Sequence, residues 1–330
     1  MFKVRKRNIL WALLLSGSFA LNGCSSGDDP IPEEPPIIEE EPSPGEEPVL
    51  PSERVKVVNM TADNIVSGNA ETRTAFTLES DKLKFAWAEN DQVGIYPTSG
   101  TQIAFTISSG AGKNSATFDG GAWALRETET YAAYYPYDVE NTARSNAELR
   151  FSYEGQHQTG KGSLAHLGAH DLMATNATTA MDGELTFKFK HLNSVALLNL
   201  TVPVAATFTT LTLRCDQEAL TKVANLDMSG SEYAYSTYET TDRLQMQLTD
   251  VASAQADKTL RFYMMLPPVD MTGKIFNVIL RSSDNRVYQD QLVSKTMQPG
   301  HAYLFAATLV DVTMASTINS PSFGDSDSEV

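Results

Sequence analysis

The sequence predicts an all-β protein made of antiparallel β-sandwiches. From about residue 54 onward, apolar and polar residues alternate over short runs, which is the period of strands with one buried face. Clusters of Gly, Asn, Asp and Ser separate these runs and predict turns. Almost no stretch carries the 3.6-residue period of an amphipathic helix. This spacing of strands and turns is typical of antiparallel sandwiches.

The N-terminus predicts export and lipidation. Residues 1–23 contain four basic side chains and then the apolar run ILWALLLSGSFAL, which is typical of a secretory signal peptide and too short to span a membrane. The run ends in LNGC, which resembles the lipobox of bacterial lipoproteins, so Cys24 would be acylated and become the first residue. Each buried CH₂ of the acyl chains contributes about 0.8 kcal/mol, enough in sum to anchor the chain in an outer membrane. Asn22 departs from the usual lipobox, and the alternative is an exported protein with an unmodified thiol.

Residues 24–53 predict an extended acidic tether. Residues 25–51 hold eight of the chain's fifteen prolines and nine acidic residues. Because proline fixes φ and like charges repel, this segment would reach roughly 80 Å at about 3.1 Å per residue. Asp28 and Asp29 resemble the surface-export signal of Bacteroidetes lipoproteins, which would place the protein at the cell surface. Alternatively, the two aspartates simply begin the acidic linker.

Residues 54–182 predict an N-terminal sandwich. A short β-rich run, RVKVVNMTA, precedes the polar stretch SGNAETRT. The strand-like runs that follow are KLKFAWAENDQVGIYP, TQIAFTIS, SATFDGGAWAL, ETYAAYYPYD and AELRFSY. The next stretch, GQHQTGKGSLAHLGAHDLMATNATT, has too little strand pattern and predicts a long connection with a short helical turn.

Residues 183–330 predict a C-terminal sandwich. About twelve or more strands in the whole chain are too many for one small sandwich, which favours two domains with a boundary near Asp182 and Gly183. The strand-like runs of the second domain are ELTFKFKHLNSVALLNLTVP, TFTTLTLRCD, LQMQLTD, KTLRFYMMLPP, KIFNVILRSS, NRVYQDQLV and HAYLFAATLV.

Charge and cysteine content exclude two classes of protein. The formal net charge is −16, so a nucleic acid would have to bind against a repulsive field, and we expect no nucleic-acid partner. Only Cys215 remains once Cys24 is acylated, which excludes an intramolecular disulfide framework. Cys215 lies in a strand-like run and is interpreted as a small hydrophobic residue rather than a nucleophile.

No motif predicts a catalytic residue, a metal or a cofactor. His166 and His170 lie four residues apart beside Asp171, but Gly168 between them favours a loop and no glutamate takes the general-base position of a zinc protease. The sequence SSGAGKNSAT lacks the spacing of a phosphate loop and is interpreted as a turn. Neither a nucleophile elbow nor a serine–histidine–carboxylate set is present, so we do not expect an enzyme. The remaining histidines are interpreted as structural: His157, His191 and His301.

The aromatic residues allow two interpretations. They could line a platform that binds sugars, or they could fill the cores of the sandwiches. Most of them fall within strand alternation, which favours the core, above all for the two tryptophans. The residues concerned are Trp87, Tyr96, Trp123, Tyr134, Tyr135 and Tyr137.

Several stretches resemble the fimbrillin family, the type V pilins and associated subunits of Bacteroidetes. The main one is TRTAFTLESDKLKFAWAENDQVGIYP at residues 72–97, followed by ATFDGGAWAL and YYPY. FKFKHLNSVALLNLTV and QPGHAYLFAATL resemble later strands of the family, so the likeness covers about residues 54–315. The resemblance implies two transthyretin-like sandwiches, a role in assembly with other fimbrial subunits, and no catalysis.

The resemblance also implies sites. A trypsin-like protease would cut after Arg73, leaving Thr74 as the new N-terminus, and a strand from another subunit would fill the groove opened by the lost segment. The removable strand would contain Val55, Val57, Val58 and Met60. The donor strand would carry Val310, Val312, Met314 and Ile318 on one face. Alternatively, Arg73 is an exposed turn residue and the tail is the last strand of its own domain.

Two function classes therefore stay open. The first is a stalk, tip or anchor subunit of surface fimbriae, exported as a lipoprotein and assembled by strand exchange. The second is a surface lipoprotein that never polymerises and binds glycans of host or bacterial surfaces through exposed aromatic residues. Burial of Trp87 and Trp123 would count against the second.

Overall fold

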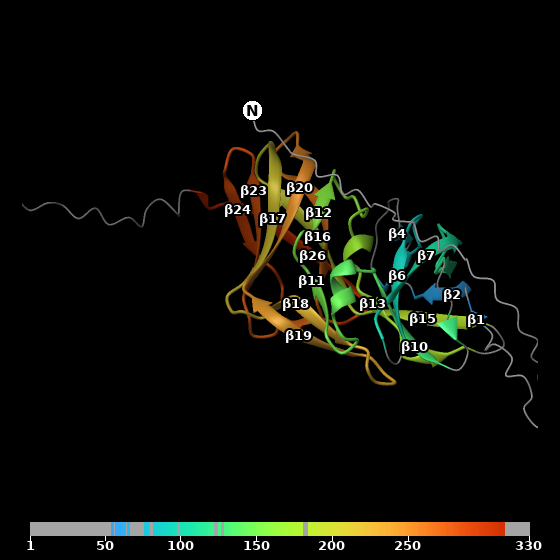
Figure 1. Cartoon of the computed structure of the whole chain (residues 1–330). Helices are drawn as coiled ribbons and strands as arrows, with labels where there is room; N and C mark the ends of the chain where they lie inside the picture. Colours follow the sequence, from blue (N-terminus) through green and yellow to red (C-terminus); the bar gives the residue numbers. More distant parts are fainter. Residues whose placement is uncertain are drawn as a thin grey trace, which may run out of the picture. The chain divides into compact units, whose positions relative to one another are not determined.

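The computed structural model describes residues 54–55, 57–63, 65–66, 76–79, 82–97, 100–121, 125–126, 129–180 and 184–313. By contacts, Val49–Val330 forms one compact unit, and the described residues all belong to it. Cys24, the signal peptide and the tether lie outside the described residues. The described chain is almost entirely β-structure (Figure 1), which confirms the predicted all-β class.

The first sheet has eight strands and closes on itself. β13 pairs with β15 on one side and with β10 on the other, which joins the two ends of the sheet. Two smaller sheets accompany it, β1 (Arg54–Val55) with β9 (Leu125–Arg126), and β3 (Ile65–Val66) with β5 (Lys82–Phe85) and β4 (Phe76–Glu79). In order, the eight strands are β13 (Met173–Ala174), β15 (Leu185–His191), β2 (Val57–Ala62), β8 (Ser115–Asp119), β7 (Ile103–Ser109), β6 (Gln92–Pro97), β10 (Thr130–Tyr135) and β14 (Thr178–Thr179).

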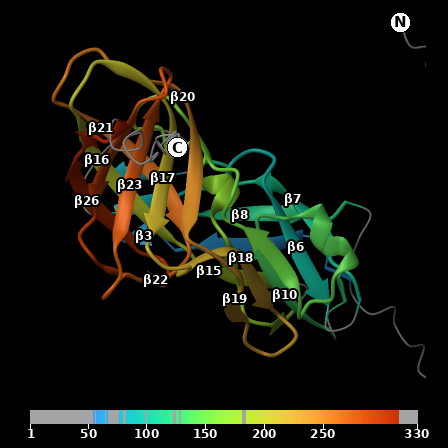
Figure 2. The same cartoon turned by 90° about the vertical axis from the view of Figure 1, so that its left-hand side faces the viewer.

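Two further sheets pack face to face in a sandwich (Figure 2). One has the order β12 (His157–Thr159), β20 (Arg243–Ser253), β17 (Ala206–Cys215), β23 (Phe276–Ser282), β24 (Val287–Gln291), β27 (Val310–Asp311). The other has the order β21 (Lys258–Leu266), β16 (Ser194–Val202), β26 (Ala302–Thr308), and β22 (Val269–Asp270) pairs with β25 (Thr296–Met297). Cys215 is buried at the end of β17, which confirms its interpretation as a core residue.

β16 serves two cores, because its residues are buried on both faces. Val195 and Leu197 point into the core of the first sheet, whereas Ala196 and Leu198 point into the core of the sandwich. This explains why the run SVALLNLTV is almost continuously apolar. The predicted boundary at Asp182 and Gly183 lies outside the described residues, and the division into two domains stays a prediction.

The structure corrects three details of the strand prediction. β18 (Leu220–Asp227) and β19 (Ala234–Thr241) form a sheet with β11 (Leu149–Ser152). β18 and β19 were not predicted from the sequence, and β19 is exposed on both faces and lacks alternation.

The predicted long connection holds β12, β13 and β14, whose two or three residues are too short to give a period. It also contains the expected helical turn, a 3₁₀-helix at Gly168–His170, while a second lies at Val139–Ala143. Three pairings are parallel, β2–β15, β12–β20 and β16–β26.

Side chains satisfy the edge of β21 that faces away from β16. The Gln156 side chain donates to the Met265 carbonyl and accepts from the Met265 N–H, both at 2.7 Å. Gln158 accepts from the N–H of Tyr263 at 2.9 Å and donates to the carbonyl of Arg261 at 3.2 Å. Both glutamines are fully buried. They stand in for a neighbouring strand, so this edge offers no open ladder to another chain.

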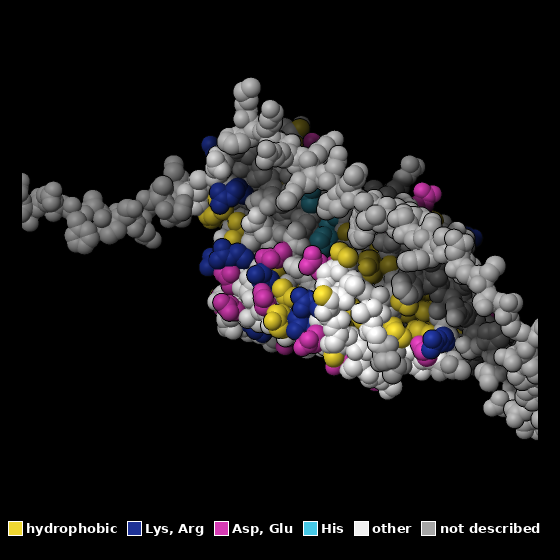
Figure 3. Space-filling view, viewed as in Figure 1, with side chains coloured by type: hydrophobic (Ala, Val, Ile, Leu, Met, Phe, Trp, Pro, Cys, Tyr) yellow, Lys and Arg dark blue, Asp and Glu magenta, His cyan; other side chains and the backbone are white. Residues whose placement is uncertain are grey.

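The surface charge is mixed on the face shown in Figure 3, where acidic and basic side chains are interspersed. Lys222 lies 3.4 Å from Glu239, and Arg286 lies 3.4 Å from Asp284. Within the described residues, none of the helices is long and apolar enough to span a membrane.

Candidate functional site

The predicted removable strand is an interior strand of the first sheet. β2 lies between β15, to which it is parallel, and β8, to which it is antiparallel. Met60 is opposite Phe187 on one side and Ala116 on the other. Both neighbours come from much later in the chain, so β2 is an N-terminal segment inserted into a sheet made by other parts. We call the space that it fills, between β15 and β8, the β2 slot.

Alternation along β2 fixes which side chains fill this slot. Val58, Met60 and Ala62 are buried in the core of the first sheet, while Asn59 and Thr61 are half-buried on the outer face. Burial of a side chain the size of Val or Met contributes roughly 1.5–3 kcal/mol, and each ladder hydrogen bond about 1 kcal/mol. Of the residues named for the removable strand, Val58 and Met60 point inward. Val55 and Val57 lie in β1 and β2, and their side chains lie outside the described residues.

The core behind the slot is aromatic. Trp87 is 1% exposed and contacts four rings edge-on, those of Phe85, Phe118, Tyr135 and Phe189, with centroid distances from 4.8 to 5.7 Å. This confirms the interpretation of Trp87 as a core residue. It follows that a strand leaving the slot uncovers an apolar, aromatic surface.

Among the described residues proposed for a sugar platform, none is an exposed aromatic. Tyr96, Tyr134 and Tyr135 are buried, Tyr137 is half-buried, and Trp123 lies outside the described residues. Tyr96 donates to the carbonyl of Asn141 at 2.9 Å, and Tyr135 donates to Asp91 at 3.0 Å. These rings pack inside the protein and present no exposed row.

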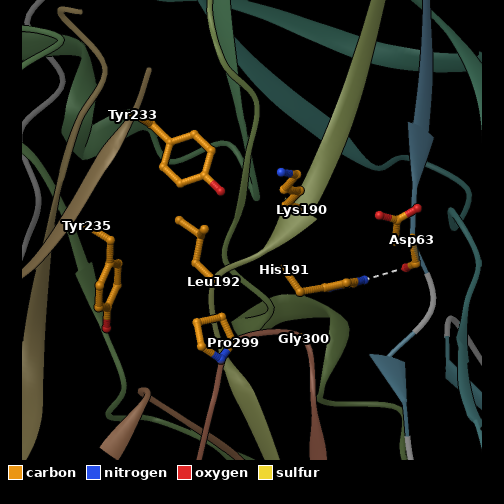
Figure 4. Close-up of a pocket in the computed structure, with 8 residues that line it drawn as sticks. All are labelled: Asp63, Lys190, His191, Leu192, Tyr233, Tyr235, Pro299 and Gly300. Atoms are coloured by element: carbon orange, nitrogen blue, oxygen red, sulfur yellow. Dashed lines mark hydrogen bonds between the residues drawn. The ribbon is translucent and has the colours of Figure 1, made fainter.

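A buried histidine and aspartate hold the end of β2. His191 closes β15, and its Nδ1 lies 2.7 Å from Oδ2 of Asp171. Its Nε2 lies 2.6 Å from the main-chain oxygen of Asp63, the residue directly after β2 (Figure 4). His191 is 5% exposed and Asp171 is fully buried. Burial opposes the charged imidazole, but Asp171 and the Asp63 carbonyl together keep the pKa of His191 above its usual value.

This contact was missed at the level of sequence, although one signal was present. The run LTFKFKH alternates, so its last residue, His191, falls on the same inward face as Phe187 and Phe189. A polar ring at a core position requires a partner. That partner, Asp171, follows the 3₁₀-turn in the segment predicted to be a connection, and nothing in the sequence links the two positions.

Three other histidines lie within hydrogen-bond distance of a main-chain or hydroxyl oxygen. His166 Nε2 lies 2.9 Å from the carbonyl oxygen of Tyr263, and His157 Nε2 lies 2.7 Å from Thr249 Oγ1. His301 Nδ1 lies 2.8 Å from the carbonyl oxygen of Pro299. Among the described residues, no group of three His, Cys, Asp or Glu side chains is arranged to hold a metal. Residues 110–114 connect β7 to β8, which confirms that the glycine-rich stretch is a turn.

The predicted cut site lies outside the described residues. Arg73 and Thr74 fall between β3 and β4 in the sequence, so a cut there would separate β1, β2 and β3 from the rest of the chain. β3 contributes two residues, Ile65 and Val66, opposite Leu83 and Lys82 of β5.

The predicted donor strand begins along the edge of β24. Val310 is opposite Gln289, and the N–H of Val312 donates to the carbonyl of Val287 at 2.9 Å. Val310 is 59% exposed, whereas Leu309 before it is buried. The side chain of Val310 therefore points away from the core of its own sandwich. Met314 and Ile318 lie outside the described residues.

Comparisons with known proteins point to one family. A family model described as fimbrillin-like matches residues 72–320. No curated protein matches the chain.

Among solved structures, a protein assigned to cell adhesion from Bacteroides ovatus is 16% identical, with a TM-score of 0.49 over 78% of this chain and 95% of that one. A similar protein from Bacteroides uniformis is 14% identical, with a TM-score of 0.47 over 77% of this chain and 92% of the other. The tip fimbrial protein Mfa3 from Porphyromonas gingivalis, with a C-terminal truncation, is 12% identical, with a TM-score of 0.29 over 72% and 82%.

Proposed function

Because the chain belongs to the fimbrillin-like family, we propose that it is a structural subunit of surface fimbriae that assembles by strand exchange. The observation that carries this proposal is the position of β2, an N-terminal strand that lies between two strands from later parts of the chain. Such a strand can be removed without cutting any other part of the sheet. The subunit has no catalytic role, and its partners are other fimbrial subunits.

Loss of β2 creates an acceptor for another strand. The facing edges of β15 and β8 lose a main-chain partner along five positions each. Unpaired backbone groups next to an apolar surface form a template for strand addition. A replacement strand needs apolar side chains at alternate positions, because those of Val58, Met60 and Ala62 leave the core.

Proteolysis after Arg73 supplies the means of removal. The cut would detach β1, β2 and β3 together with everything before them, including the tether and acylated Cys24. The mature chain would begin at Thr74. Before the cut, the lipid holds the precursor on the outer membrane, and afterwards the subunit belongs to the fimbrium at the cell surface.

The C-terminal segment is the donor in this proposal. Val310, Val312, Met314 and Ile318 lie on one face at a period of two that is interrupted at Ser316. Val310 is exposed where it stands, so its side chain loses no core contact when the segment leaves β24. The hydrogen bonds of β27 to β24 would be exchanged for a full ladder in the β2 slot of a second copy or of a related subunit.

A reversible lock on β2 tests this function. Asn59 and Thr117 are direct cross-strand partners, and such Cα atoms lie within the range that a disulfide bridges. We expect the double variant Asn59→Cys/Thr117→Cys to stay unassembled when oxidised, because the cut segment remains tied into the slot. Reduction should restore the denaturation-resistant ladders on a gel.

The matched control places the same lock between strands that stay together. Gln92 of β6 and Thr106 of β7 are also direct partners, so Gln92→Cys/Thr106→Cys should assemble whether oxidised or reduced. Ladders from the oxidised Asn59→Cys/Thr117→Cys variant would refute exchange at the β2 slot.

A further inference from the structure

The contact between His191 and Asp63 lies at the point where the β2 ladder stops. The last pair of the β2–β15 register is Ala62 with Phe189. One residue further, the Asp63 carbonyl turns to the His191 ring instead of continuing the ladder. Figure 4 shows the ring reaching from the end of β15 toward this carbonyl. The contact therefore defines one fixed position along the β2 slot, at which the carbonyl after the last paired residue must lie.

Both nitrogens of the ring face hydrogen-bond acceptors. Oδ2 of Asp171 lies at Nδ1, and a carbonyl oxygen, which cannot donate, lies at Nε2. A neutral imidazole has one N–H, so it satisfies both contacts only if Asp171 carries a proton. The His191–Asp171 pair therefore holds the strand when it carries two protons in total. One is the proton of neutral imidazole, and the second is shared between the ring and the carboxyl group. Without this proton, a nitrogen lone pair faces an oxygen atom.

The groups around the pair influence whether it keeps this second proton. The second oxygen of Asp171 accepts no hydrogen bond from the described residues, and burial raises the pKa of this carboxyl. The negative charge of Asp63, on the β2 side, favours the protonated ring of His191. Tyr135 and Tyr153 lie near Asp171, and burial raises the pKa of both well above the usual value, so they stay neutral. His191 also lines a cavity of about 370 Å³ with Lys190, which gives solvent a path toward the pair.

Resting on strand exchange as the function, we propose that Asp171 and His191 form a proton-dependent clamp on the strand in the β2 slot. The clamp binds a main-chain carbonyl and selects an extended peptide strand that places three alternate apolar residues in the core and then turns its next carbonyl inward. It sets the register of the strand. Its grip is strong at mildly acidic pH and weakens as the pH rises.

Amide hydrogen exchange of the full chain tests the clamp. In the wild type, opening of the β2 amides, corrected for the intrinsic rate, should increase about tenfold or more from about pH 6 to pH 8.5, as expected for loss of one charge-assisted hydrogen bond. The amides of β16 in the same sample report global unfolding, which also breaks the clamp, so their opening should increase by no more than that of the β2 amides. In His191→Gln, which cannot titrate, the β2 slope should vanish.

His166→Gln is the matched control, because His166 is a second imidazole within hydrogen-bond distance of a main-chain carbonyl, that of Tyr263 in β21 and not that of the residue after β2. It should keep the β2 slope. Equal slopes for β2 in wild type and His191→Gln would overturn the clamp. If His191→Gln does not fold, Asp171→Asn replaces it, and a β2 slope in Asp171→Asn equal to that of the wild type would overturn the clamp.

Failure of the clamp and failure of strand exchange remain distinguishable. A His191-dependent slope in a chain that never forms ladders supports the clamp on its own β2 and refutes exchange. Ladders formed by a chain whose β2 amides show no such slope support exchange and refute the clamp.

Discussion

The side-chain amide of Gln156 makes two hydrogen bonds of 2.7 Å to the main chain of Met265, one to its N–H and one to its carbonyl. A side chain thus takes the place of a β-strand at this edge of β21. The β2 slot differs, because there both edges are satisfied by a strand that a single cut can release.

Replacing Gln156 with leucine should therefore destabilise the whole fold. The N–H and carbonyl of Met265 would stay buried without partners, which costs roughly 2–4 kcal/mol in the free energy of unfolding. Urea denaturation measures this change. Gln217→Leu, in an exposed turn, is the control and should shift the free energy by less than about 0.5 kcal/mol. Similar values for the two variants would show that the edge of β21 does not depend on its glutamine.

Truncation of the inward face of β2 should weaken the strand far more than truncation of its outer face. Met60 is fully buried, so Met60→Ala should lower the free energy of unfolding by about 2–5 kcal/mol. Thr61→Ala, next to it on the outer face, should cost about 1 kcal/mol or less. Chemical denaturation of both variants gives the comparison, and equal losses would contradict the inward orientation of the slot's contacts.

Protonation of His166 should lower the free energy of unfolding in acid. Burial lowers the pKa of this imidazole to about 4, below the 6.5 of an unfolded histidine. Its contribution is thus fully present above pH 6.5 and is lost as the pH falls toward 4, by an amount on the order of 2–3 kcal/mol. Thermal unfolding of wild type and His166→Gln between these pH values tests this, and the variant should show a shallower decline. Parallel curves would exclude His166 as the source.

A charge on the predicted donor face should block assembly without unfolding the monomer. Val310 is 59% exposed, so Val310→Asp should change the free energy of unfolding by less than about 0.5 kcal/mol. In a β2 slot, however, an aspartate at this position would be buried beside aromatic side chains, and ladders should disappear. Val293→Asp, at another exposed valine (72%), should leave assembly intact. Normal ladders from Val310→Asp would exclude Val310 from the donor face.

The sequence predicted strands in the runs that contain β2 and β15, where β-favouring residues and alternation are clear. It could not predict which strands pair, because the parallel contact of Met60 with Phe187 joins distant segments through tertiary packing. β19 was missed since it has no buried face. The clamp was missed for a related reason: Asp171 follows a 3₁₀-turn, and only the folded chain brings it to His191.

Removal of β2 and assembly by strand exchange can both be tested by intact-mass and N-terminal analysis of the protein taken from the surface of the cells that make it. We expect a chain that begins at Thr74, has lost β2, and is found in high-mass ladders that resist denaturation. A chain that begins at acylated Cys24, keeps β2 and runs as a monomer would contradict assembly by strand exchange for this subunit.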